Sequence, residues 1–314
     1  MSLQSQAHLL SVGHIRGGNP EPPGGPIPYG EQVYTTPGTY TWIAPEAAAW
    51  TNISAVVVAA GTPSNPGPGA GGPGGALVYG NNIPIVYGKA YTIKVGSSSG
   101  NWNQNPAQDS YIRDPGYDLS GSEAYIIFAT SARHYSQALP HPNPGGDTSP
   151  KQTHRSGGGA GGPGGPYTNG WYIDGGGGAG GYSGAGGAGG GGTAHTNLNM
   201  GDSLPGTGGG GGGGSGGGAP SDTPLTGGNG GGVGMHGQGS NGSGAGGQPS
   251  TATSPGVDGG NGSPGPTGVF GGGAGSNRLN PQPGMNGGVR IVWGGPPASS
   301  GGTNRQFPTT NVGE

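Results

Sequence analysis

Residues 208–214 read Gly-Gly-Gly-Gly-Gly-Gly-Gly, a run that has no side chain to bury. Glycine makes up 85 of the 314 residues, and most of it falls in runs after residue 155. Glycine loses more backbone entropy on folding than any other residue. Such a chain either stays disordered or becomes ordered through backbone hydrogen bonds, and this choice decides the fold.

The composition argues against one large hydrophobic core and also against ordinary disorder. Hydrophobic residues, with glycine not counted, make up 28% of the chain, whereas a globular domain has about 45–50% when glycine is counted. Charged residues make up 7%, against about 25% in a globular domain. Disordered chains usually combine low hydrophobicity with high charge. The formal net charge of −3 gives no sign of nucleic-acid binding, and no apolar stretch is long enough for membrane insertion. Cysteine is absent, which excludes disulfides and thiolate metal sites.

Residues 31–135 carry most of the strand signal and predict an antiparallel β-sandwich, because short β-branched and aromatic runs alternate there with turn signals. The run 52–60 is apolar throughout, as in a central strand. Thr36-Pro37-Gly38 predicts a hairpin turn between the runs 32–35 and 39–43. The other expected strands span residues 76–79, 83–86, 90–95, 110–113 and 124–129.

Three details complete this prediction. Pro84 confines the run 83–86 to a sheet edge or a bulge, because proline has no N–H to donate. Residues 46–50 can form one helical turn at most, and no other helix is expected. Residues 288–294 return to strand character and are expected to pair back onto the sandwich.

Residues 156–288 are glycine-rich, with more polar connectors between the runs. A collagen helix is excluded because there is no strict Gly-X-Y period. A flexible linker remains an alternative, although it needs no patterned connectors. The patterned runs favour a bundle of polyproline-like or polyglycine-II strands, which have three residues per turn and no hydrogen bonds within a strand. Without side chains, such strands can exchange N–H···O=C bonds on several sides.

The remaining segments are short. Residues 1–30 are rich in proline and glycine and read as an extended arm that attaches to a partner, or as a disordered tail. Residues 136–155 form a proline-rich loop, and residues 289–314 contain the returning strand and a tail. The arm lacks the apolar core of a signal peptide, which favours assembly inside a cell followed by lysis. Its candidate attachment residues are Leu9, Leu10, Ile15 and Arg16.

The sequence holds no convincing catalytic or cofactor motif. Paired carboxylates and a nucleophile elbow are absent, so we expect neither an enzyme nor a cofactor. His134, His141 and His154 share one long loop and could meet a metal ion, but the plainer interpretation is exposed loop residues. No metal site is therefore predicted.

Aromatic side chains in polar loops are the best candidates for recognition. Aromatic residues on loops of a rigid scaffold add contact area at low entropic cost. The alternative is that they cover a glycine-rich surface that has no side chains of its own. The connectors offer further candidates. The candidate contact residues are Trp102, Tyr117, Tyr135, His141, Tyr167, Trp171, Tyr172, His195, Asn197 and Leu225.

Several stretches resemble glycine-rich structural proteins from phages of marine cyanobacteria. The resemblance covers roughly residues 31–314 and is most specific at the end of the chain, in Gly288-Val289-Arg290-Ile291-Val292-Trp293-Gly294 and Arg305-Gln306-Phe307-Pro308-Thr309-Thr310-Asn311. Residues 34–45, 53–58, 88–96, 178–184 and 232–242 also carry it. The proline-rich segment 97–155 departs from the usual pattern. The expected glycine bundle is also similar to the fibre-tip adhesins of T-even-like phages.

The resemblance implies a virion structural protein, most simply a tail fibre or a fibre-tip adhesin that contacts a host-surface receptor through loops. Its partners would be other virion proteins and a host glycan or outer-membrane protein, with a homotrimer as one possible assembly. It would be assembled in the host cytoplasm and act outside the cell as part of the virion. A capsid or tail decoration protein and a secreted matrix protein with a disordered glycine-rich tail remain as alternatives.

Overall fold

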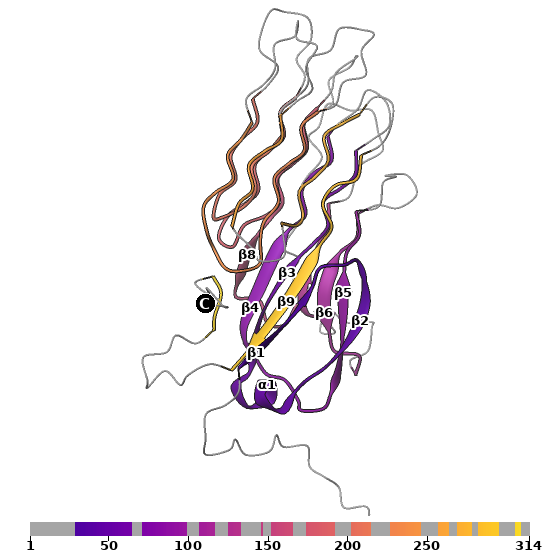
Figure 1. Cartoon of the computed structure of the whole chain (residues 1–314), viewed down its shortest axis with the longest axis vertical. Coiled ribbons are helices and arrows are strands. Elements are labelled where there is room, and N and C mark those ends of the chain that lie inside the picture. The colour runs from indigo at the N-terminus through magenta and orange to yellow at the C-terminus, as the bar shows by residue number, and fades with distance from the viewer. Residues whose placement is uncertain are drawn as a thin grey trace, which may run out of the picture.

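A computed structural model gives the fold (Figure 1). The residues that it describes are 29–64, 71–98, 107–116, 125–132, 146, 152–165, 174–191, 202–214, 227–245, 257–263, 269–277, 282–294 and 305–308. Within these residues the protein is mainly β, with two antiparallel sheets and one short helix.

Sheet A has five strands in the described part of the chain, in the order β1-β9-β3-β4-β8. Their bounds are β1 Gly30–Tyr34, β3 Ile53–Val58, β4 Leu77–Ile83, β8 Gly157–Gly159 and β9 Gly288–Trp293. Sheet B has four strands in the same part, in the order β2-β5-β6-β7. Their bounds are β2 Gly38–Ile43, β5 Ala90–Val95, β6 Ser110–Arg113 and β7 Tyr125–Ala129, and the helix α1 is Glu46–Thr51.

Sheet A is buried on both faces. One face packs against sheet B around a shared core, to which Val57, Ile291, Ile93 and Ile127 contribute. The other face is covered by side chains from later segments, among them Tyr182, Met235, Phe270 and Phe307. All six residues of β3 are therefore buried, which explains why its sequence is apolar throughout rather than alternating.

The expected returning strand is confirmed. β9 lies between β1 and β3 and pairs antiparallel with both, with Ile291 opposite Gln32 on one side and Ala55 on the other. A strand from the end of the chain thus occupies an interior position of a sheet whose other long strands come from its first third. Both ends of the described chain are tied together by this pairing.

Three local expectations were wrong. The runs on either side of Thr36-Pro37-Gly38 do not form a hairpin, because β1 pairs with β9 in sheet A and β2 pairs with β5 in sheet B. The runs 76–79 and 83–86 are not two strands: β4 takes in residues 77–79, continues through Gly80 and ends at Ile83, and residues 84–86 lie outside any strand. The helix α1 extends to Thr51, beyond the single turn expected.

The strands of sheet A continue at one end into glycine-rich segments (Figure 1). Together these segments form what we call the glycine layer, residues 59–64, 71–76, 160–165, 174–191, 202–214, 227–245, 257–263, 269–277 and 282–287. Residues 59–64 follow β3 directly, residues 71–76 lead into β4, and residues 282–287 lead into β9. The layer thus also takes in segments from the part of the chain expected to form the sandwich.

Backbone hydrogen bonds hold the glycine layer together. In segment 174–182, the partner changes with each residue and repeats every third residue. The N–H groups of residues 175–180 donate in order to the carbonyls of Gly190, Gly228, Gly72, Gly187, Gly231 and Gly75. The numbering shows that the segment around Gly187 runs antiparallel, whereas those around Gly231 and Gly75 run parallel. One segment is thus bonded to neighbours on three sides.

This packing leaves no room for side chains at many glycines. A Cβ atom at Gly211 would lie 1.9 Å from the carbonyl oxygen of Gly231, and one at Gly178 would lie 2.0 Å from that of Gly211. Real Cβ atoms do not approach so closely. Glycine is therefore required here by the close approach of neighbouring backbones.

Candidate binding surface

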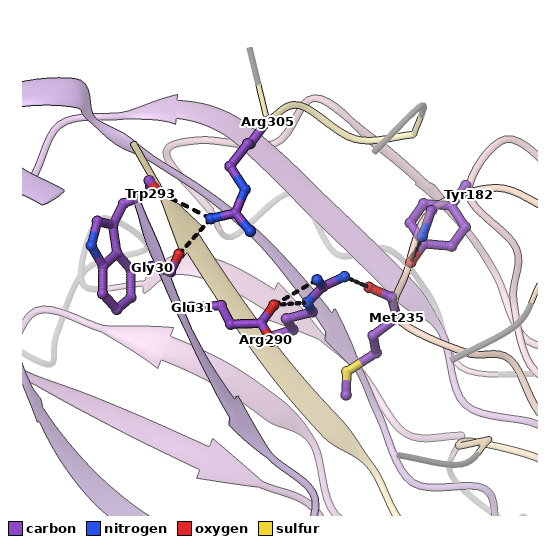
Figure 2. Close-up of polar contacts among 8 residues, drawn as sticks. Gly30, Glu31, Tyr182, Met235, Arg290, Trp293 and Arg305 are labelled. Carbon is purple, nitrogen blue, oxygen red and sulfur yellow. Dashed lines mark hydrogen bonds and ion pairs between the residues drawn. The ribbon is translucent and has the colours of Figure 1, made fainter. Parts of the chain in front are cut away.

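A buried arginine joins sheet A to the glycine layer (Figure 2). Arg290 of β9 points to the outer face of sheet A, and its side chain is 0% exposed. Its Nε and Nη2 donate to Glu31 Oε2 at 3.1 and 2.6 Å, and its Nη1 donates to the Met235 carbonyl at 3.0 Å. The ion pair spans β1 and β9, and the Met235 contact fixes a turn of the glycine layer against them.

Tyr182 lies beside this junction, at another turn of the glycine layer. Its hydroxyl donates to the Gly234 carbonyl and accepts from the Gly237 N–H, both at 3.1 Å. The side chain is 0% exposed. Burial raises the pKa of the Tyr182 hydroxyl well above its ordinary value of 10.0. The phenol is therefore neutral, and both of its hydrogen bonds are to the backbone of the glycine layer.

Residues 305–308 dock onto the same outer face of sheet A. Phe307 packs against both Tyr79 and Tyr182, with ring centroids 6.1 and 5.9 Å away. The Asn81 side chain accepts from the Phe307 N–H and donates to its carbonyl, as a neighbouring strand would. Arg305 donates to the carbonyls of Gly30 and Trp293. The junction is therefore a rigid attachment between the two regions.

The end of the glycine layer away from the sheets, which we call the free end, gathers the ends of many segments. Asp174 and Ser276 bond to each other there, and Ser276 also accepts from Gly227. Gly190 donates to Gly214, which donates in turn to Gly176. Ser203 and Ala245 are bonded in the same way, as are Ser64 and Gln282. Described segments that are far apart in the sequence thus end together at the free end.

The sequence-predicted contact residues lie outside the described residues, so their prediction stays open. These are Trp102, Tyr117, Tyr135, His141, Tyr167, Trp171, Tyr172, His195, Asn197 and Leu225, and the same holds for Leu9, Leu10, Ile15 and Arg16. The described residues that flank these candidates in the sequence lie at different places in the fold. Gly165 and Asp174, which flank Tyr167, Trp171 and Tyr172 in the sequence, lie at the free end. Gly116 and Tyr125, the described residues on either side of Tyr117 in the sequence, lie at the opposite end of the two sheets.

A groove opens on one side of the glycine layer, with a volume of about 220 Å³. Its lining is mostly backbone, with a few polar side chains and one methionine. The lining residues are Asn229, Gly230, Asp258, Gly259, Asn261, Gly272, Gly273, Pro283, Gly284 and Met285. The sequence gives no signal for this groove, because asparagine and aspartate within glycine runs look like ordinary turn residues.

A histidine metal site finds no support among the described residues. His154 is the one member of the predicted trio that lies within them, and its N–H donates to the Ile126 carbonyl of β7. Burial lowers the pKa of its imidazole. No cluster of three potential ligands occurs in the described part of the chain. The described residues also contain no helix long and apolar enough to cross a membrane.

The residues of the junction were missed as well. Arg290 stands inside an apolar strand, and a charged residue there signals a buried pair, but its partner Glu31 is far away in the sequence.

Comparisons with protein-family models, with curated proteins and with solved structures gave no match.

Proposed function

We propose that the glycine layer is a bundle of polyglycine-II strands. A strand with three residues per turn presents successive N–H groups in three directions. The change of partner at every residue of segment 174–182, with its repeat at every third residue, supports this geometry. So does the close approach of neighbouring backbones at Gly178 and Gly211. Such a bundle is stiff, because each strand is bonded on several sides.

On this basis the protein is a virion structural protein of a bacteriophage, a tail fibre or fibre-tip adhesin without enzymatic activity or a cofactor. The observation that carries the proposal is that the two ends of the molecule differ. Many chain segments begin and end at the free end, whereas β1 starts at the opposite end of sheet A, where Gly30 pairs with Trp293. Residues 1–28 precede this end in the sequence. One end thus suits attachment to the virion and the other suits contact with a host.

The host ligand would be a surface glycan or an outer-membrane protein. Loops that carry aromatic and polar side chains on a stiff support are typical of recognition surfaces. Tyr167, Trp171 and Tyr172 are the contact candidates whose flanking residues lie at the free end, and His195, Asn197 and Leu225 share this position. The polyglycine bundle supplies the rigid support.

The test measures binding of labelled full-length protein to cells and outer-membrane fractions from a panel of marine cyanobacteria. We expect replacement of Tyr167, Trp171 and Tyr172 by alanine to weaken binding by more than about tenfold, because aromatic contacts of this kind are often worth about 2 kcal/mol. Tyr117→Ala is the matched control and should bind normally. A protein that binds no member of the panel would argue against the adhesin. A high copy number over the capsid or tail would favour a decoration protein instead.

A further inference from the structure

One side of the glycine layer departs from the regular hydrogen-bond repeat. In segment 227–233, the N–H groups of Gly227, Gly230 and Val233 donate to carbonyls of segment 270–276, and Gly231 donates to the Gly212 carbonyl. The repeat therefore leaves Asn229 and Gly232 facing a third direction. In the interior segment 174–182, the corresponding third direction meets another backbone.

Segment 257–263 lies on this side, and its Gly259 and Gly262 N–H groups donate to the Asn229 and Gly232 carbonyls. The Asn229 and Gly232 N–H groups, however, donate to side chains instead of to backbone carbonyls. Asn229 N–H donates to Asp258 Oδ1 at 2.6 Å, and Gly232 N–H donates to Asn261 Oδ1 at 3.0 Å. Gly275 N–H donates to Asn229 Oδ1 at 3.0 Å. Three side-chain oxygens thus act as the carbonyls that a neighbouring strand would supply. All three of these residues line the groove.

The side-chain oxygens do not provide a partner for every backbone group that faces the groove. Gly272 precedes Gly275 by one repeat, so its N–H points toward the same side, but it donates to no acceptor among the described residues. The Gly230 carbonyl likewise accepts from no described donor. Both residues are buried and both line the groove. Buried backbone groups are almost always hydrogen-bonded, so this pair calls for a partner.

Four segments of the glycine layer border the groove. Segments 227–233, 270–276 and 282–287 surround it, and segment 257–263 forms its outer wall. Segments 270–276 and 282–287 are bonded to each other through Met285 N–H and the Gly272 carbonyl. The groove therefore lies where one more extended segment would complete the packing.

We infer that this groove is an open strand position that binds an extended, glycine-rich segment of another polypeptide. A carbonyl of the guest accepts from Gly272 N–H, and a guest N–H donates to the Gly230 carbonyl. Glycine is needed in the guest for the same reason as in the host: a Cβ at Gly272 would already lie 2.3 Å from the Gly230 oxygen. The inference rests on the hydrogen bonds of this groove and is independent of any role in a virion.

The test is a titration of the ¹⁵N-labelled full-length protein with the peptide Gly-Gly-Asn-Gly-Gly-Gly-Val, which copies residues 227–233. We expect chemical-shift changes at Gly230, Gly272 and Gly284. Exchange of the Gly272 amide with solvent should slow about tenfold when the free peptide is at ten times its Kd. A peptide with alanine in place of each glycine should cause neither effect.

Two variants locate the binding. Pro283→Trp fills the groove from an exposed position and should abolish the response. Leu204→Trp adds the same bulk at a residue that is 61% exposed and does not line the groove, and it should leave the response unchanged. No response in the unmodified protein, or an equal response to the alanine peptide, would overturn the inference. So would a groove that responds to an N-acetylglucosamine oligosaccharide but not to the glycine peptide.

Discussion

Some chain segments belong first to sheet A and then to the glycine layer, but the sheets and the layer are stabilised by different interactions. Between the sheets, stability comes from side chains such as Ile93 and Ile127, which are fully buried. A few residues further along the same chain segments, side chains nearly vanish and backbone hydrogen bonds do the packing. The step is abrupt: β3 ends at Val58, and Gly61 N–H already donates to the Met285 carbonyl.

The core between the sheets and the glycine layer should differ in how well they tolerate amino-acid substitutions. A side-chain core can absorb a change in volume by repacking, at a cost that depends on the site. A layer of touching backbones has nothing that can move aside, because the nearest atoms belong to other main chains. The glycine layer should therefore be far less tolerant of added atoms than the sandwich core is of lost ones.

The largest effect is expected for Gly211→Val. The new Cβ would lie 1.9 Å from the Gly231 carbonyl oxygen, so neighbouring segments must separate. We expect a loss of more than about 4 kcal/mol in the free energy of unfolding, or failure to fold. Ile93→Val, which removes one methyl group from the sandwich core, should cost about 1 kcal/mol. Urea unfolding of both variants makes the comparison.

A matched glycine outside the layer serves as the control. Gly88 has a φ of +70°, and a Cβ there would meet nothing within 4 Å. Gly88→Ala should cost about 1–2 kcal/mol, through backbone strain alone. A Gly211→Val protein as stable as Gly88→Ala would mean that the layer can open, and the contrast between the two regions would then be lost.

Much more of the two sheets than of the glycine layer or the binding surface could be predicted from the sequence. The periodic runs predicted the strands at 90–95 and 110–113 without error, because the alternation of apolar and polar side chains indicates which face of a strand is buried. The false hairpin at 36–38 shows the limit, because turn chemistry is local whereas pairing with β9 is not. Glycine runs carry no facing information, so neither neighbours nor register could be read from them. The groove depends on which neighbour is absent, and no sequence pattern records that.

A medium effect is expected at the junction between the two regions. Glu31→Ala leaves the guanidinium of Arg290 buried with the Met235 carbonyl but without its carboxylate. We expect a loss of about 3 kcal/mol in the free energy of unfolding, at the low end for a broken buried pair because Glu31 is 41% exposed. Combining Glu31→Ala with Arg290→Met should recover most of the loss. The partly exposed pair Lys89–Asp114 is the control, and Lys89→Ala should cost less than about 1 kcal/mol.

The smallest effect is a difference in pH dependence at Tyr182. Burial raises the pKa of its hydroxyl above the ordinary 10.0, so above pH 10 the unfolded chain releases this proton while the folded chain keeps it. Stability is therefore unaffected below pH 10 and falls as the pH rises beyond it, by up to about 1.4 kcal/mol per pH unit for one group. Tyr182→Phe should be less stable at pH 8 by about 1–2 kcal/mol, because Gly237 N–H and the Gly234 carbonyl lose their partner.

The same variant should lose less stability between pH 10 and pH 11 than the unmodified protein. It should not become insensitive, because burial also raises the pKa values of Tyr34, Tyr79 and Tyr111. Urea unfolding at pH 8, 10 and 11 measures both slopes. Equal slopes would mean that the Tyr182 hydroxyl is reached by solvent in the folded protein. The turn at residues 182–184 would then be a loose part of the glycine layer, and the junction beside it would be less rigid than its contacts indicate.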